Sequence, residues 1–188
     1  MSSKFTIQNS KTQFGLVSRM NHLLTAIIVF SLIGIGLYMH DIEDPVLKET
    51  FYDLHKSMGI ALFGLMLVRL FWLKISPNPP QHSHNKLEHI LAHSVKGTLY
   101  LTMLIMPILG WVVANSDGAE VSFFNLFSLP NIVSESESLH DITKEIHESI
   151  AFVILALIGL HIAGALKHHF VYKDNTLQRM FGKPKGED

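Results

Sequence analysis

The stretch HESIAFVILALIGLH, residues 147–161, is the most informative part of this sequence about the fold. It is apolar between two histidines that stand fourteen residues apart. At about 1.5 Å rise and 100° per residue, this spacing places both imidazoles on nearly the same side of a helix, about 21 Å apart. Ionisable side chains inside apolar spans are costly and mark functional sites. The stretch therefore predicts a membrane helix with two functional histidines.

The whole chain is more apolar than an ordinary soluble domain. Of its 188 residues, 48% are hydrophobic and only 16% are charged. A membrane-spanning helix needs about 20 apolar residues. Four segments reach this length, at about residues 16–39, 55–73, 91–114 and 147–170. The sequence predicts an all-α fold, an integral membrane four-helix bundle that forms a single domain over residues 1–188.

The charged residues predict how the chain lies in the membrane. Twelve of the 15 lysines and arginines fall near the termini or at the ends of the spans on the same side. Twelve of the 16 acidic residues fall in the connections around residues 41–53 and 117–148. By the positive-inside rule, the N and C termini are both cytoplasmic. The tail 173–188 is predicted to be short, amphipathic and basic, and to lie at anionic lipid.

Cysteine is absent from the sequence. This excludes disulfides, iron–sulfur clusters held by cysteine and the C-x-x-C-H attachment of c-type haem. Any metal cofactor must therefore be held by other side chains. A nucleic-acid partner is not expected.

Four of the twelve histidines lie at matched depths. His22 lies about one turn inside the first span, and His161 lies in the inner half of the fourth. His55 and His147 open the second and fourth spans at the outer face. Pairing by depth gives an inner couple, His22 and His161, and an outer couple, His55 and His147. Two imidazoles from different helices can be the axial ligands of a b-type haem iron, so the sequence predicts two haems at two depths.

Residues near these histidines could support a porphyrin. Arg69 follows His55 by fourteen residues, and Arg19 lies one turn before His22. Both are candidates for contact with haem propionates, because arginine forms bidentate pairs with carboxylates. Snorkelling of both guanidinium groups to the cytoplasmic interface is the open alternative. Small residues could leave room for the ring or serve close helix packing, namely Gly59, Gly159 and Gly164.

Four stretches of the chain resemble the bacterial cytochrome b561 family: KEIHESIAFVILALIGLHIAGALKHHFVYKDNTLQRM (144–180), LHKSMGIALFGLMLVRL (54–70), MPILGWV (106–112) and SRMNHLL (18–24). The resemblance implies a dihaem cytochrome of the bacterial inner membrane, with an inner haem on His22 and His161 and an outer haem on His55 and His147. It also implies electron transfer between an outer-side (periplasmic) donor and membrane ubiquinone. In some members the donor is superoxide.

The resemblance favours His168 for contact with quinone. A quinone carbonyl needs a hydrogen-bond donor and its reduction needs a proton source, and histidine serves both purposes near neutral pH. An interfacial histidine cluster is the alternative. His89 and His93, four residues apart, could bind zinc, although no carboxylate completes an obvious site.

The outer connections do not favour superoxide as the donor. They carry twelve acidic residues against three lysines, and a negative field repels an anion. Lys56, beside His55, and Lys144, one turn before His147, could form a local positive entrance. A protein donor or another small reductant stays open.

Two other functions are compatible with the sequence. The chain could be the cytochrome b anchor of a larger dehydrogenase or hydrogenase, with a partner subunit. It could also be a haem-free metal transporter whose histidines bind zinc or copper. The outer segment VSFFNLFSLP (121–130) is too short to span, and we expect it at the membrane surface or over the outer haem.

Overall fold

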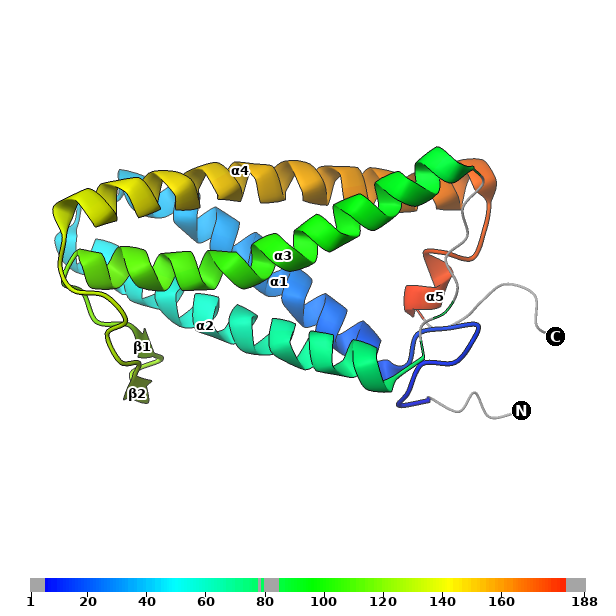
Figure 1. The fold of residues 1–188 in the computed structure, drawn as a ribbon, viewed down its shortest axis with the longest axis horizontal. Coiled ribbons are helices and arrows are strands. Elements are labelled where there is room, and N and C mark those ends of the chain that lie inside the picture. The colour runs from blue at the N-terminus through cyan, green and yellow to red at the C-terminus, as the bar shows by residue number, and fades with distance from the viewer. Residues whose placement is uncertain (1–5, 78, 80–84, 182–188) are drawn as a thin grey trace. The chain divides into compact units, whose positions relative to one another are not determined.

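The computed structural model describes residues 6–77, 79 and 85–181. Four long helices dominate it: α1 (Leu16–Tyr38), α2 (Pro45–Ile75), α3 (Lys86–Ser116) and α4 (Glu137–Lys167) (Figure 1). Each is long and apolar enough to cross a membrane. Large apolar side chains such as Leu23, Phe30 and Phe71 are exposed on these helices, as is usual where lipid surrounds the protein. The predicted all-α membrane fold with four spanning helices is confirmed.

Shorter elements lie in the connections and at the C-terminal side. They are the 3-10 helix η1 (Met39–Asp41), strands β1 (Ser122–Phe123) and β2 (Phe127–Ser128), the π-helix η2 (His168–Tyr172) and helix α5 (Gln178–Phe181). The π-helix continues α4 and ends at Lys173, whose φ of 55° is left-handed. Helix α5 lies in the predicted amphipathic tail, and residues 182–188 of that tail lie outside the described residues.

Three of the long helices begin before the apolar runs that predicted them. Helix α2 begins at Pro45, where Asp44 caps it by accepting a hydrogen bond from the Leu47 amide at 2.8 Å. Proline at the first helical position and aspartate at the cap are both favourable helix-start signals. In the same way, Asn85 caps α3 and Ser136 caps α4. The helix starts are therefore set by polar caps, and the apolar runs mark only the membrane-embedded part.

The chain divides into two compact units. One unit, Met1–Leu24, Leu67–Leu99 and Ala156–Asp188, carries twelve lysines and arginines against four acidic residues, and we call it the basic unit. The other, Thr25–Met66 and Tyr100–Leu155, carries twelve acidic residues against three lysines, and we call it the acidic unit. Each long helix contributes one stretch to each unit. That the chain is a single domain stays a prediction.

In the basic unit, an ordered segment precedes α1. Asn9 is buried, its amide donates to Ser76 Oγ at 3.1 Å, and its Oδ1 accepts from the Gly15 amide at 2.8 Å. A Cβ on Gly15 would lie 2.4 Å from the backbone of Gln8, so only glycine fits this close approach. These contacts tie the start of α1 to the end of α2.

In the acidic unit, Asn115 organises the connection between α3 and α4. It is 2% exposed, its Nδ2 donates to the Ala119 carbonyl and to Asn131 Oδ1, and its Oδ1 accepts from the Ile132 amide. A buried side-chain amide is stable only when its donors and acceptor are paired in this way. The connection is therefore a defined structure rather than an open loop.

Candidate functional site

The inner couple lies within the basic unit. His22 comes from α1 and His161 from α4, and their ring centroids are 6.2 Å apart with an angle of 35° between the ring planes. The structure thus brings together the two histidines that the sequence paired by depth.

The outer couple lies within the acidic unit. His55 comes from α2 and His147 from α4, and their ring centroids are 6.3 Å apart with an interplanar angle of 63°. This couple too combines the two histidines that the sequence paired. Helix α4 therefore contributes one imidazole to each couple.

Both separations fit a metal ion held between two imidazoles. With a bond of about 2.0–2.1 Å, the length typical of zinc, and about 1.1 Å from nitrogen to ring centre, centroids on opposite sides of a metal lie about 6.3 Å apart. Ordinary aromatic packing covers about 4.5–7 Å and so includes the same value. The centroid distance alone does not separate the two arrangements.

At the outer couple, unpaired nitrogens favour a metal site over ordinary aromatic packing. Nδ1 of His55 and Nδ1 of His147 are buried, and neither has a hydrogen-bond partner among the described residues. A buried polar atom without a partner costs about 1–3 kcal/mol. Packing alone would favour apolar rings at these positions, whereas a metal ligand must be an imidazole, which would bind through the ring nitrogen that does not face Gly36 or Gly110. The residues present therefore fit a haem iron with two histidine ligands.

Two glycines lie directly against the outer imidazoles. A Cβ on Gly36 of α1 would lie 3.4 Å from His55 Cε1, and a Cβ on Gly110 of α3 would lie 3.2 Å from His147 Cε1. The glycines noted in the sequence have open space beside them. An added Cβ would meet nothing within 4 Å at Gly59, Gly159 and Gly164. Gly36 and Gly110 were missed because they lie on helices that carry neither outer histidine. Their only signal is glycine within an apolar helix.

Two cationic side chains lie near the inner couple. Arg69 interacts electrostatically with both His22 and His161, and Lys96 interacts with His161. Arg19 is half-buried one turn before His22. The structure therefore places both Arg69 and Lys96 near the inner couple. Sequence analysis counted Lys96 only as a topology signal.

His168 lies in a polar cluster at the C-terminal end of α4, within the basic unit. Its Nδ1 lies 2.5 Å from Asp174 Oδ2, and both side chains are 16% exposed. Burial alone would raise the pKa of Asp174, but hydrogen bonds from His168 and Thr176 outweigh it and lower the pKa. Asp174 therefore remains a carboxylate at neutral pH, and it can hold a proton on His168 Nδ1.

Glu88 gathers two further polar side chains in the basic unit. Its Oε1 accepts hydrogen bonds from Lys167 Nζ at 2.6 Å and from Tyr172 OH at 2.5 Å. Sequence analysis missed Asp174, Glu88 and Tyr172 as members of such clusters. Their partners lie on different elements, and only the fold brings them together.

The remaining histidines do not form a metal site in the part of the chain that is described. The rings of His89 and His93 are 4.2 Å apart and exposed. No group of three or more metal-ligating side chains occurs among residues 6–77, 79 and 85–181. His140 Nδ1 lies 3.2 Å from the Val113 carbonyl, and His40 lies 3.8 Å from Glu148. The zinc alternative for His89 and His93 finds no support.

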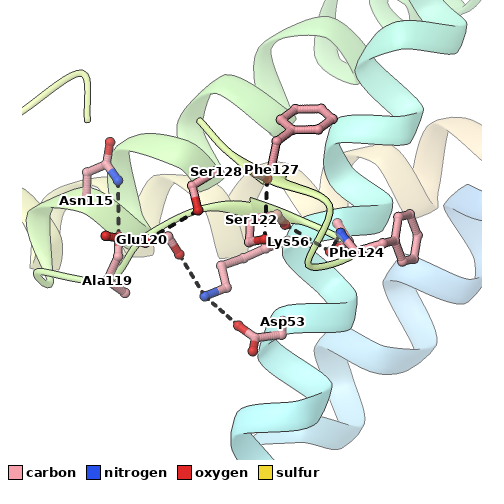
Figure 2. A network of polar contacts seen from close by, with 10 residues as sticks. Asp53, Lys56, Asn115, Ala119, Glu120, Ser122, Phe124, Phe127 and Ser128 are labelled. Atoms are coloured by element: carbon pink, nitrogen blue, oxygen red, sulfur yellow. Dashed lines mark hydrogen bonds and ion pairs between the residues drawn. The ribbon is translucent and has the colours of Figure 1, made fainter. Parts of the chain in front are cut away.

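The lysine beside His55 is already engaged. Lys56 Nζ pairs with Asp53 Oδ1 at 2.8 Å and donates to the Glu120 carbonyl at 3.0 Å (Figure 2). Lys144 is exposed, and so are all twelve acidic residues of the acidic unit. The surface of this unit is therefore strongly negative, with little cationic charge near the outer couple.

Comparison with known proteins agrees with the geometry. The family model for prokaryotic cytochrome b561 matches residues 13–183. Cytochrome b561 homolog 2 of Escherichia coli (strain K12) is 32% identical over 188 residues, covering 95% of this chain and 96% of the relative. The probable superoxide oxidase CybB of Yersinia pestis is 33% identical over 165 residues, covering 87% and 91%. Cytochrome b561 homolog 1 of Escherichia coli (strain K12) is 29% identical over 140 residues, covering 74% and 77%.

These matches extend over nearly the whole chain and its four spanning helices. They leave the haem-free transporter alternative without support, because the family name itself implies b-type haem. The chain belongs to the prokaryotic cytochrome b561 family and is a multi-pass membrane electron-transfer protein.

Proposed function

We propose that the chain transfers electrons from a periplasmic donor to ubiquinone and holds two b-type haems. The observation that carries this proposal is the presence of two histidine couples, each joining two helices, at 6.2 and 6.3 Å. His22 and His161 would hold the inner haem, and His55 and His147 the outer haem. When bound, the haems supply reversible one-electron chemistry, while the protein supplies ligands and electrostatics.

The orientation in the membrane follows from charge. Lysine and arginine are retained on the cytoplasmic side, so the twelve in the basic unit support its placement at the cytoplasm. Both termini are then cytoplasmic, and the membrane is the bacterial inner membrane. Arg19 and Arg69 of the basic unit are suited to haem propionates, since guanidinium groups bind carboxylates with charge-assisted hydrogen bonds.

Quinone reduction requires a hydrogen-bond donor and a source of protons. His168 is suited to both roles, because Asp174 Oδ2 lies 2.5 Å from its Nδ1, and a histidine held by a carboxylate can carry protons and pass them on. The nearby cluster of Glu88, Lys167 and Tyr172 adds further exchangeable protons in the same unit. This arrangement supports the basic unit as the quinone side.

The periplasmic donor is the part of the function on which two observations disagree. A relative that is 33% identical is named a probable superoxide oxidase, which supports superoxide. The exposed acids of the acidic unit and the engagement of Lys56 instead favour a neutral or cationic donor. Superoxide stays our candidate donor. Haem reduction by superoxide, measured at low and at high salt, tests this choice.

The haem proposal is tested on purified protein by a dithionite-reduced minus oxidised spectrum with pyridine haemochrome quantitation. We expect two b haems per chain, and a colourless folded protein would contradict the proposal. Asp174→Asn should retain both haems and lower the rate of ubiquinone reduction by about tenfold or more, because His168 loses the partner that orients it. An unchanged rate would remove His168 and Asp174 from the quinone site.

The donor is tested in liposomes with superoxide generated outside. If superoxide is the donor, raising ionic strength from about 10 to 150 mM should increase its rate, because salt screens repulsion by the acids. The ferric-haem spectrum and the rate with a neutral reductant serve as controls. Absence of haem reduction by superoxide at either salt concentration would exclude it as the donor.

A further inference from the structure

Within the outer connection, β1 and β2 form a short hairpin with an unusual turn. The strands are antiparallel, with Ser122 opposite Ser128 and Phe123 opposite Phe127. The turn residues Phe124 and Asn125 have left-handed φ values of 47° and 58°. Asparagine tolerates this conformation, whereas for a bulky residue such as phenylalanine it is rare. The Phe124 backbone is therefore held by contacts outside the turn.

The tip of the hairpin is apolar and exposed. The Phe123 ring lies 4.9 Å from that of Phe124 and 5.3 Å from that of Phe127, so three aromatic side chains form one cluster. Phe124 is 47%, Phe127 57% and Leu126 75% exposed. Exposed apolar clusters of this kind mark contact with a partner or a membrane.

The base of the hairpin is polar and is fastened to α2. Ser57, which is 3% exposed, donates to the Ser122 carbonyl and accepts from the Phe124 amide, both at 3.0 Å. Lys56 Nζ adds a hydrogen bond to the Glu120 carbonyl in the preceding segment. These bonds account for the conformation of Phe124 and fix the tip beside Ser57.

The position of Ser57 along α2 sets the depth of the tip. Asp53 and Lys56 precede it, and the next charged residue of the helix is Arg69. The uncharged part of the spanning helix thus begins at Ser57. A tip bonded to Ser57 lies at the level where α2 enters the membrane, and its base lies beside the charged residues just outside.

We propose that the β1–β2 hairpin is an interfacial anchor whose tip, Phe124, Leu126 and Phe127, inserts among the phospholipids of the outer leaflet. Phenylalanine and leucine side chains of interfacial segments are buried at the boundary between headgroups and acyl chains, where the polar backbone of the hairpin still meets water. The anchor would hold α2 at a fixed depth only two residues from His55. This inference rests on the spanning helices and does not depend on the electron donor or acceptor.

The chain has no cysteine, so a single introduced cysteine can be labelled selectively. The full haem-loaded protein is labelled with a nitrobenzoxadiazole fluorophore at Leu126→Cys, or at Ser134→Cys as an exposed control in the same connection, and placed in phosphatidylcholine liposomes. We expect nitroxide-labelled lipid to quench the Leu126→Cys label several-fold more than the control label, and aqueous iodide to quench it less. Equal quenching at both positions would overturn the proposal and leave the tip open to a protein partner.

A second variant tests how the depth is set. Ser57→Ala in the Leu126→Cys background removes both hydrogen bonds, and we expect lipid quenching at Leu126→Cys to fall while the haem spectrum is unchanged. Ser57→Thr retains the hydroxyl and should restore the quenching. Unchanged quenching in Ser57→Ala would overturn the role of Ser57 in placing the tip.

Discussion

The two histidine couples are alike in separation but differ in their surroundings. The ring centroids are 6.2 Å apart in the basic unit and 6.3 Å apart in the acidic unit. Around the inner couple the neighbours are cationic, Arg69 and Lys96. Around the outer couple they are glycines, Gly36 and Gly110, which lie against the imidazoles. The same arrangement of two imidazoles thus has charged neighbours in the basic unit and closely packed glycines in the acidic unit.

This difference has a consequence for electron transfer. Positive charge near a redox centre favours its reduced state and raises its potential. Arg69 and Lys96 would therefore favour residence of the electron at the inner couple, which corresponds to flow from the periplasmic side towards quinone. The outer couple has no such cations in contact among the described residues, and the glycines instead determine how its rings can turn.

The largest expected effect is the loss of one haem. His161→Ala should remove only the inner haem and His55→Ala only the outer, so that pyridine haemochrome falls from about two to about one per chain in each variant. The component that remains in the reduced-minus-oxidised spectrum should differ between the two variants. His93→Ala, an exposed histidine of α3, is the control. Loss of the same component in both variants would contradict the assignment of ligands to couples.

A smaller effect is expected from the charge beside the inner couple. Lys96→Met should lower the midpoint potential of the inner haem by several tens of millivolts, because a positive charge near a redox centre stabilises its reduced state. The potential of the outer haem should stay the same. Lys74→Met, an exposed lysine at the end of α2, is the matched control. A redox titration in which Lys96→Met and Lys74→Met coincide would remove the electrostatic half of the comparison.

The smallest effect is expected at the outer couple. Gly110→Ala places a Cβ 3.2 Å from His147 Cε1, so the ring must shift by a few tenths of an ångström. Overpacking of this kind costs about 1 kcal/mol or more. We expect a changed low-spin electron paramagnetic resonance signal from the outer haem only. In Gly97→Ala, on the same helix, the new Cβ would meet nothing within 4 Å, so neither the inner nor the outer haem signal should change. Equal spectra for both variants would show that Gly110 does not position His147.

Part of the site could be predicted from the amino-acid sequence. The four apolar runs predicted the spanning helices, and the depths of four histidines along them predicted the two couples that the structure brings together. The helix starts could not be placed from these runs, because caps such as Asp44 act through a single hydrogen bond outside the apolar segment. The partners of Lys56 could not be predicted either, since they include a carbonyl in a connection far along the chain.

The membrane fold and the pairing of the four histidines by depth could be predicted from the amino-acid sequence alone. The length of an apolar run and the depth of a histidine within it can be read from one segment at a time. Hydrophobic burial in lipid also acts on each segment separately. The packing of the helices was needed to show which glycine lies against which imidazole, which cations lie near the inner couple, and that Asp174 pairs with His168. These contacts depend on how helices rotate against one another and how a chain turns after a helix ends. Both result from packing between segments, which no single segment encodes.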